Sequence, residues 1–549
     1  MAQLTVTDLS TPLVANAPWI DALISSSGAP NGDPSVANWN WLVPIRNTVR
    51  YTFNVASDIS LSMGVSDSAA GIFNPAQQAA ARQILAYVTS VTGIQFAETS
   101  SGRDADIQFA VCDITNPALA GEAAWRLSYT FEASGSVTST TLQQFVFLDN
   151  REHQGVNNTP FAGNPGYEVL LHEIGHALGL KHPFEEPPTL PSSRDNTSQT
   201  VMSYTHVGGP YSQFNEVDLA ALAYLYGYDG VGGDWGAGTS GAFYQGTSFD
   251  ETFTSGTGRF AWIGMGGNDV LSLTQPFAAS TLGLTADKAW LIIEQSNSTN
   301  FVAPSIETLV FPDNAISFSD VFRGLQLSAS ARFGTAAAEV MNGTGGNDVF
   351  FARGGDDFVV GSGGMDTALY QGVRGQYAIS RAGAGAELLY DVADGFGAGR
   401  DGTDRVSGIE RLKFADSSVA FDLQGAAGMT AKLIGALFGA QFVSNKQFVG
   451  IGISLFDTGL TYDQVAGVAA ANGFFAQLAG SHSNIDFVNH VYRNVVGVPP
   501  SSSDLNFYVG LLDSGVHTQA TLAVLAAETP QVQQNINLVG LQQSGLEYV

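Results

Sequence analysis

Residues 172–182 read HEIGHALGLKH, and this stretch decides the fold of the first half of the chain. The apolar run Val169 to Leu171 before it suits a helix, which would place His172 and His176 one turn apart on a single face. Two imidazoles in that arrangement can bind one Zn²⁺ at about 2.0–2.1 Å, and Glu173 beside them can reach a water on the metal. The spacing therefore predicts a helix that carries two zinc ligands and an acid.

The residues that follow supply a third ligand. Gly179 is suited to end the helix, because glycine adopts the left-handed conformation without a steric penalty, and the chain can then bring in His182. The fourth position of the metal is left to water. Residues 200–204 read TVMSY, with Met202 placed for a tight turn beneath the metal and Tyr204 two residues later. Taken alone, these two would be an ordinary buried methionine and a packed tyrosine, but with the histidines they predict a zinc peptidase.

This constellation resembles the metzincin metalloproteases, and Pro183 after the third histidine, with Met202-Ser203-Tyr204, resembles their serralysin branch. The resemblance implies three zinc ligands and one general base and acid, namely His172, His176, His182 and Glu173. It also implies that Tyr204 swings between the metal and the tetrahedral intermediate, above a hydrophobic floor formed by Met202. The span between His182 and Met202 is shorter than expected for serralysins and is rich in proline, so cleavage specificity is not carried over.

Composition narrows the functional classes. The chain has 549 residues with a formal net charge of −28, which disfavours binding to nucleic acid or anionic lipid and suits cations. Cys112 is the only cysteine and lies in an apolar, strand-like stretch, so we expect a buried packing residue rather than a redox or zinc-latency role. The sequence contains no uninterrupted apolar run of about 18 residues, so no membrane span is predicted. The first ten residues do not resemble a cleaved secretory signal.

The predicted catalytic domain covers residues 39–230 and alternates strands with helices. Predicted strands lie at 48–55, 94–97, 107–111 and 140–148, and predicted helices at 77–91 and 218–226. The strand at 140–148 is expected at the sheet edge, where it could pair with an extended substrate. Residues 1–38 are expected to be irregular, and they could form a short inhibitory pro-segment (a zymogen) or a disordered tail.

Nonapeptide repeats mark the next region, predicted to span residues 231–425. Three copies at 343–369 and an earlier one near 264–271 match the GGxGxDxUx pattern of calcium-binding RTX repeats. Such repeats form a parallel β-roll in which loops eighteen residues apart stack, so Asp348 and Asp366 are expected to share a Ca²⁺ and Asp357 to face the other side, with Glu339 as its possible partner. The predicted calcium residues are Gly343, Gly345, Asp348, Asp357, Gly361, Gly363, Asp366 and Asp269.

RTX proteins of this kind resemble substrates of type I secretion, which implies an ABC-type exporter as partner and an extracellular protein that folds where calcium is plentiful. The final residues, an acid followed by apolar side chains, resemble an uncleaved C-terminal export signal. A cytoplasmic zinc peptidase is a further reading, which the calcium repeats disfavour.

Residues 426–549 show helical periodicity, with helices expected from Asn484 to Gly497 and from Thr518 to Glu528. This region resembles a helical domain of unknown function found on bacterial secreted repeat proteins, and we expect a role in export or attachment to the cell surface. The expected fold class is α+β multidomain: a metzincin zinc protease domain, a parallel β-roll and a mainly helical C-terminal domain. The expected function is a secreted zinc endopeptidase with structural Ca²⁺, and the alternative is a calcium-binding adhesion protein in which the protease domain is subsidiary.

Overall fold

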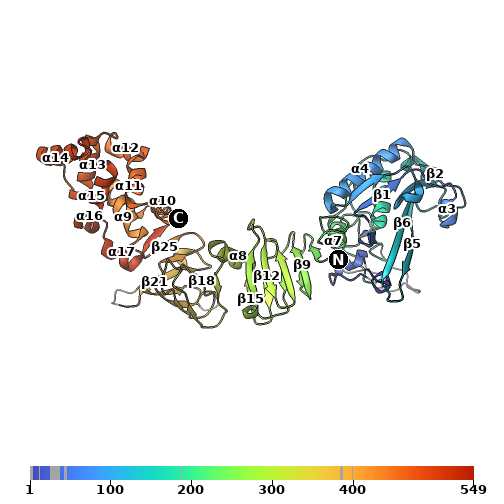
Figure 1. The fold of residues 1–549 in the computed structure, drawn as a ribbon, viewed down its shortest axis with the longest axis horizontal. Coiled ribbons are helices and arrows are strands. Elements are labelled where there is room, and N and C mark those ends of the chain that lie inside the picture. The colour runs from blue at the N-terminus through green and yellow to red at the C-terminus, as the bar shows by residue number, and fades with distance from the viewer. Residues whose placement is uncertain are drawn as a thin grey trace. The chain divides into compact units, whose positions relative to one another are not determined.

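The computed structural model describes residues 4–10, 13–24, 38–42, 46–185, 187–383, 388–397 and 400–549. The chain divides into two compact units, Met1–Ser319 and Asp320–Val549 (Figure 1). The division falls inside the predicted 231–425 region, and the predicted domain boundaries stay predictions. The expected α+β multidomain class is confirmed.

The first unit begins with a mixed sheet whose strand order is β3-β1-β4-β6-β5, with β2 paired to β4. Its strands are β1 (Thr48–Thr52), β2 (Gly71–Ile72), β3 (Gln95–Glu98), β4 (Ile107–Cys112), β5 (Gly121–Phe131) and β6 (Val137–Asp149). The prediction that the strand at 140–148 lies at the edge is wrong: β6 pairs with β4 on one side and β5 on the other. The edge strand next to β6 is β5. Its residues are largely exposed, so its sequence lacks the apolar alternation that marks a strand.

Helices pack around this sheet. They are α3 (Ile59–Ser62), α4 (Pro75–Thr92), α5 (Gln154–Asn157), α6 (Pro165–Ala177) and α7 (Glu216–Tyr226). The long helix α4 begins as predicted, with Asn74 as its cap: the Asn74 side chain accepts hydrogen bonds from the Ala76 and Gln77 amides, and the Asn74 amide donates to the Gln77 side-chain oxygen. Cys112, at the end of β4, is buried as predicted, and burial raises the pKa of its thiol to about 12.

The N-terminal segment differs from the expectation of an irregular tail. It forms α1 (Val6–Ser10) and α2 (Pro18–Ile24), and α2 packs into the core of the unit, where the Leu23 carbonyl accepts a hydrogen bond from the Lys181 amide at 2.7 Å. Asp21 fixes the turn that leads into α2, because its carboxylate accepts hydrogen bonds from the Ala15 and Ala17 amides. Residues 25–37 of the predicted pro-segment lie outside the described residues. The short 3₁₀ helix Trp39–Leu42 then enters the catalytic fold.

The rest of the first unit is a β-roll of two sheets, ordered β15-β14-β10-β8 and β11-β12-β13-β9-β7. Its strands are β7 (Ala242–Gln245), β8 (Thr252–Thr254), β9 (Gly258–Ile263), β10 (Val270–Ser272), β11 (Thr281–Leu284), β12 (Leu291–Gln295), β13 (Ser298–Val302), β14 (Thr308–Phe311) and β15 (Asn314–Ser317). The parallel pairing of Val270 with Thr252 confirms that coils eighteen residues apart stack.

The boundary between the units lies inside helix α8 (Phe318–Leu327), so most of this helix belongs to the second unit. Another roll comes next, and its sheets are ordered β16-β18-β20-β24-β25-β26 and β17-β19-β23-β22-β21. Its strands are β16 (Arg332–Phe333), β17 (Val340–Asn342), β18 (Val349–Phe351), β19 (Phe358–Val360), β20 (Thr367–Leu369), β21 (Tyr377–Arg381), β22 (Leu389–Asp394), β23 (Thr403–Ser407), β24 (Arg411–Lys413), β25 (Ser418–Ala420) and β26 (Leu546–Tyr548). The last strand, near the end of the chain, pairs antiparallel with β25.

Helices form the rest of the second unit around a core that is largely aliphatic with two buried phenylalanines, Phe475 and Phe487. They are α9 (Ala426–Leu437), α10 (Lys446–Asp457), α11 (Tyr462–Ala470), α12 (Gly473–Ala479), α13 (Asn484–Val496), α14 (Ser502–Asp513), α15 (Gln519–Ala527), α16 (Pro530–Asn535) and α17 (Leu538–Ser544). Helix α13 is capped by Ser483 rather than by the predicted Asn484, and Gly497 ends it as predicted. Among the described residues, no helix is both long and apolar enough to cross a membrane.

Candidate metal centre

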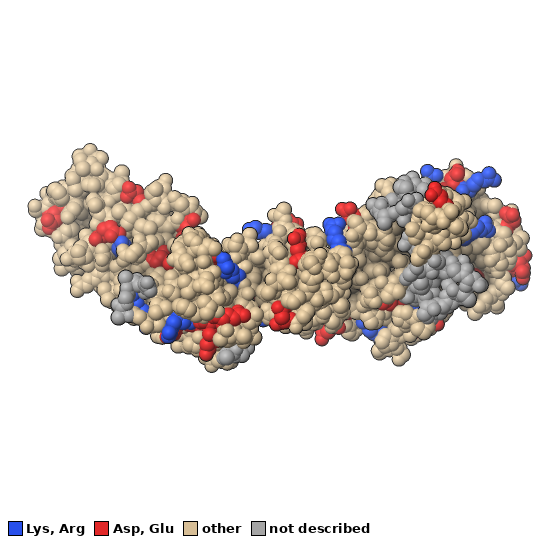
Figure 2. Space-filling model, turned by 60° about the horizontal axis from the view of Figure 1, so that its bottom comes forward, with Lys and Arg blue, Asp and Glu red and all other residues tan. Residues whose placement is uncertain are grey.

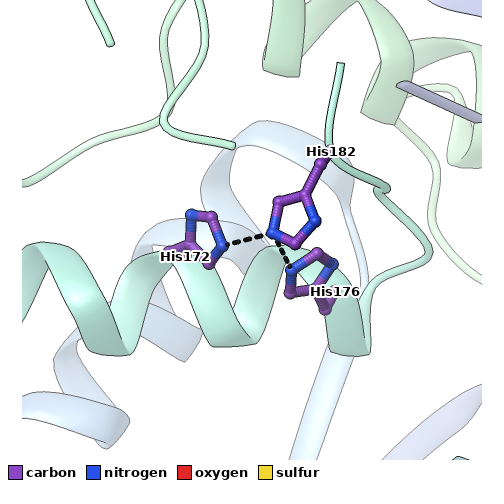
Figure 3. A group of neighbouring side chains, drawn as sticks. All are labelled: His172, His176 and His182. Carbon is purple, nitrogen blue, oxygen red and sulfur yellow. Dashed lines mark hydrogen bonds between the residues drawn. The ribbon is translucent and has the colours of Figure 1, made fainter. Parts of the chain in front are cut away.

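Helix α6 carries the first two histidines of the predicted zinc site. It begins at Pro165, where the Asn164 side chain caps the Tyr167 amide at 2.9 Å, and its last residue is Ala177. Gly179, with φ of +97°, reverses the chain as predicted. His182 therefore returns to face the helix, and the Nε2 atoms of His172 and His176 each lie 3.1 Å from Nε2 of His182 (Figure 3).

The second nitrogen of each ring fixes its tautomer. Nδ1 lies 2.8 Å from the Val201 carbonyl in His172, 2.8 Å from the Leu180 carbonyl in His176 and 2.6 Å from a carboxylate oxygen of Glu185 in His182. Carbonyl and carboxylate oxygens only accept, so each Nδ1 carries a proton and each ring can bind a metal only through Nε2. Burial, with the neighbouring histidines, lowers the pKa of His172 to about 4 and that of His176 well below its usual value.

The three Nε2 atoms converge on one point and fit a metal ion. Nitrogens at about 2.0–2.1 Å from a tetrahedral zinc ion are roughly 3.3 Å apart, close to the spacing seen here. Neutral rings with protonated Nδ1 cannot donate hydrogen bonds to one another through Nε2, so only a cation or an added proton satisfies all three. Among the described residues, His172, His176 and His182 form one of two groups of potential ligands close enough to hold an ion.

Glu173 and Tyr204 lie beside the converging nitrogens. The Glu173 side chain is 5% exposed, and burial, followed by the charge of Glu122, raises its pKa to about 8. The ring of Tyr204 lies 4.7 Å from that of His182 and 5.8 Å from that of His172, measured between centroids, and half of the residue remains exposed. The structure thus brings the predicted acid and the predicted hydroxyl donor to the same centre.

Met202 lies beneath the centre, fully buried. Its sulfur packs against Gly175 of helix α6 so closely that a Cβ atom on that glycine would lie 2.6 Å from it. The turn is held by Asp218 of α7, whose carboxylate accepts hydrogen bonds from the Thr200 hydroxyl and from the Val201 and Asn215 amides. Because the Val201 carbonyl orients His172, this buried acid supports the metal centre indirectly.

The predicted calcium residues lie in the stacked coils of the two rolls. The Asp348 amide donates to the Asp366 carboxylate at 2.8 Å, the Glu339 amide to Asp357 at 2.7 Å and the Glu251 amide to Asp269 at 2.8 Å. The glycines Gly343 and Gly361 occupy equivalent positions in adjacent coils, and a Cβ atom on Gly343 would lie 2.2 Å from the Gly361 carbonyl oxygen. Gly345 and Gly363 are also equivalent, but a Cβ atom on Gly363 would lie at an ordinary contact distance of 3.9 Å from the Gly345 Cα atom. Asp348 and Asp366 therefore adjoin, and Asp357 adjoins Glu339, as the repeat spacing predicts.

Comparison with known proteins assigns a family to the region around each of these sites. Residues 57–227 match the family described as Matrixin, and residues 333–368 match four copies of the RTX calcium-binding nonapeptide repeat. The chain contains a serralysin-like metzincin domain and RTX repeats. Residues 467–534 match DUF4214, a domain of unknown function.

Curated relatives of this metzincin domain include Serralysin of Photorhabdus laumondii, 27% identical over 197 residues, which covers 33% of this chain and 38% of the relative. Serralysin of Photorhabdus sp. (strain Az29) is 32% identical over 28% of this chain and 34% of its own length. Metalloprotease AprA of Pseudomonas entomophila is 29% identical over 228 residues, 37% of this chain and 44% of the relative. The chain thus spans less than half the length of these relatives.

Three residues that support this site are not predicted by the sequence motifs. Glu185 holds His182, Asp218 holds the methionine turn, and Gly121 of β5 contacts Glu173, since a Cβ there would lie 2.7 Å from the Glu173 Cγ atom. The only sequence signal was the spacing of Asn215 and Asp218, which marks a helix start and not a role in the site. The other two acquire their roles by contact across the fold.

Two hollows of the metzincin domain meet at the histidines. One of about 540 Å³ is lined by Leu119, Val169, Val201 and Pro210 together with His172 and Glu173. The other, of about 360 Å³, is lined by Gly121, Trp125, Lys181 and Glu185 together with the three histidines. Both contain Glu173 and Tyr204, so a chain lying along the edge strand β5 would pass over the acid and the hydroxyl.

Proposed function

We propose that this chain is a secreted zinc-dependent endopeptidase whose zinc ligands are His172, His176 and His182. The observation that carries the proposal is the convergence of three Nε2 atoms whose partner Nδ1 atoms are all committed to acceptors. A zinc ion bound there would act as a Lewis acid that acidifies water and polarises a carbonyl group. The serralysin and AprA relatives support the same activity class.

Glu173 acts as the general base and acid. Its burial at the meeting point of the two hollows keeps bulk water away. A cation held by the three histidines would favour the ionised carboxylate, which can then take a proton from the attacking water and return it to the leaving amine. Tyr204 supplies a hydroxyl donor for the developing oxyanion, a contribution whose removal typically costs about 10²–10³ in rate. Its exposed position over the histidine rings leaves it free to turn toward the substrate.

The substrate is an extended polypeptide bound along β5. Within the part of the chain that the structure describes, this strand pairs only with β6, so its other edge offers backbone donors and acceptors. Pairing through the backbone binds a peptide without reading each side chain, which suits cleavage of many proteins. The proline-rich segment after His182 departs from the serralysin pattern. The family's preferred residues around the cleaved bond are therefore not transferred to this chain.

The rolls fold with Ca²⁺ after export. The buried carboxylates of the repeats repel one another until a cation binds, so low calcium inside the cell would keep the chain exportable and high calcium outside would fold it. We propose an ABC-type exporter as the partner and an uncleaved signal at the C-terminal end. Measuring the protein in the medium with and without that exporter tests this: release without it would contradict the proposal.

We propose that any latency imposed by residues 1–38 comes from the part that precedes α2, because α2 is a core element. Deleting residues 1–12 should raise initial activity if those residues obstruct the cleft, whereas unchanged activity would contradict latency by this part. For the helical domain we propose attachment to the cell surface. Deletion of residues 430–540 should then shift the protein from cells to medium, and unchanged fractionation would count against it.

Casein cleavage by the purified full chain tests the activity. We expect turnover that a zinc chelator abolishes and zinc restores, and a loss of about 10²–10⁴ in Glu173→Gln with zinc content unchanged. The matched control is Glu132→Gln, the same chemical change at an exposed position between β5 and β6. A zinc-loaded protein that cleaves nothing would instead support a calcium-binding adhesion protein with a silent protease domain.

A further inference from the structure

The helices of the second unit surround a small hollow that the proposed peptidase does not use. It lies among α9, α10, α11 and the start of α12, and its volume is about 130 Å³. Its floor includes Leu433 and Ile434 of α9 and Val465 of α11, which are 3–5% exposed. Among the described residues that line it, none is charged. The hollow therefore offers contacts to a neutral, mainly apolar molecule.

Three phenylalanines form one wall of this space, which we call the aromatic hollow. They are Phe438 at the end of α9, Phe448 of α10 and Phe474 of α12, and all three are only partly buried. Their ring centroids lie 5.8 Å (Phe438 to Phe448), 5.9 Å (Phe438 to Phe474) and 5.3 Å (Phe448 to Phe474) apart. Aromatic rings attract one another at such distances in tilted or edge-to-face arrangements. A further ring that enters the hollow would extend this cluster.

The hydroxyl of Thr430 borders the aromatic hollow without a hydrogen-bond partner. Thr430 lies in α9 and is 1% exposed, and its Oγ1 makes no hydrogen bond among the described residues. A helical threonine can donate to the carbonyl one turn earlier, and the buried Thr92 of α4 does so, to the Val88 carbonyl at 2.8 Å. Thr430 makes no such bond. Leaving a hydroxyl buried and unpaired is costly, so this group calls for a partner.

Helix α10 closes one side of this hydroxyl. A Cβ atom on Gly452 would lie 2.5 Å from Cγ2 of Thr430 and 2.9 Å from its Oγ1, so the backbone of α10 packs directly against the threonine. Thr430 and Gly452 both line the aromatic hollow. A partner for the hydroxyl can therefore come from a molecule in the hollow.

The mouth of the aromatic hollow is apolar as well. Ile451 and Val468 line it and are 60% and 49% exposed, so they form a rim that an apolar molecule can reach from solvent. Figure 2 shows that uncharged residues cover most of the visible face of the helical part, with scattered acidic residues between them. These surroundings favour a neutral ligand over an anion.

The volume of the hollow limits the size of its occupant. An engineered protein cavity of about 150 Å³ lined by leucine, isoleucine and phenylalanine binds benzene, so a space of about 130 Å³ suits one six-membered ring. A helix of another chain, about 10–12 Å across with its side chains, is too large to enter. The occupant that fits is a small molecule and not a polypeptide segment.

We propose that the aromatic hollow binds a small neutral molecule with one aromatic ring and one hydroxyl or carbonyl group. The ring packs against Phe438, Phe448 and Phe474, and the polar group hydrogen-bonds to Thr430. Thr430, Phe438 and Phe448 precede residues 467–534, the region that matches the domain of unknown function, so that family model does not cover the site. This binding activity is separate from peptide hydrolysis and does not depend on it.

Binding of phenol and of toluene to the purified full chain tests the proposal, measured by ligand-observed NMR titration. We expect saturable binding of both in the wild type. Thr430→Val should weaken phenol binding by about 2- to 10-fold, the effect of one hydrogen bond, and should leave toluene binding unchanged. Thr92→Val is the matched control, because it makes the same change at a buried helical threonine of the first unit, and it should bind phenol as the wild type does. No saturable phenol binding, or equal phenol affinity in the wild type and Thr430→Val, would overturn the proposal.

A second measurement keeps the test decisive if Thr430→Val does not fold. Crystals of the wild-type chain grown with 4-bromophenol should show the anomalous bromine peak among the rings of Phe438, Phe448 and Phe474. A second hollow of about 510 Å³ lies along α13 and α15, lined by Phe487, Tyr492 and Leu525 among others. Bromine found only there, or at no position in the helical part, would overturn the assignment. Both measurements leave catalysis aside, so an inactive protein that binds phenol would refute the peptidase and leave this site standing.

Discussion

Replacing Gly121 by alanine should impair catalysis without removing the metal. A Cβ atom at this position would lie 2.7 Å from Cγ of Glu173 and 2.8 Å from its Oε1, whereas ordinary contact begins at 3.4 Å. The Glu173 carboxylate must therefore move by about 0.7 Å or the edge strand must shift by as much. A misplacement of about 1 Å at a catalytic group can cost about 10²-fold in rate, so we expect kcat/KM to fall on the order of 10- to 100-fold. That loss corresponds to about 1.4–2.7 kcal/mol of transition-state stabilisation.

The assay compares casein or fluorogenic-peptide cleavage, zinc content and Tm for Gly121→Ala and Gly155→Ala. Gly155 is the matched control, because a Cβ there meets nothing within 4 Å in the same domain. Zinc content should stay at the wild-type value in both variants, since the three atoms nearest to the new methyl group of Gly121→Ala all belong to Glu173 and not to a histidine. Full activity in Gly121→Ala, or an equal loss in Gly155→Ala, would refute the inference that Gly121 positions Glu173.

Three further predictions concern other parts of the chain. Asp218→Ala removes the acceptor for three buried donors around the methionine turn and should destabilise the first unit by about 3–5 kcal/mol, seen as a fall in Tm of roughly 6–20 °C; an unchanged Tm would contradict the support role. Metal-free protein should lose stability as pH rises from about 4 to about 7. Burial and neighbouring acids raise the pKa values of Asp269 and Asp366, so in this range the folded state holds protons that the unfolded state has lost. Thermal melts with a calcium chelator at pH 5 and pH 8 check this prediction, and added calcium should remove the pH dependence. Cys112 should resist thiol reagents at pH 8 until the protein unfolds, because burial raises its pKa to about 12; rapid labelling of the native chain would contradict its buried placement.

The zinc site was predictable because its information is local. The spacing of His172, His176 and His182 on a helix and its turn places three imidazoles together whatever the surrounding fold does. The coils of the rolls are local in the same sense, since a nine-residue period forces positions eighteen residues apart to stack. Patterns of this kind survive without knowledge of tertiary structure.

Features that depend on contacts across the fold were missed. The edge strand β5 is mostly exposed and so lacks the apolar alternation by which strands are recognised, whereas the more buried β6 was found and wrongly placed at the edge. Helix α2 was read as an irregular segment because seven residues are too few to show periodicity, although burial against the domain makes it ordered. The division of the roll region between two units likewise depends on contacts that the repeat spacing does not reveal.

The most direct test of the central claim is a zinc K-edge X-ray absorption spectrum of the purified full chain. We predict one zinc ion per chain, with a first shell of three imidazole nitrogens at about 2.0–2.1 Å and at least one lighter oxygen ligand. A protein purified gently that holds no zinc, or a spectrum without the multiple scattering of three imidazole rings, would contradict the assignment of His172, His176 and His182 as the metal centre.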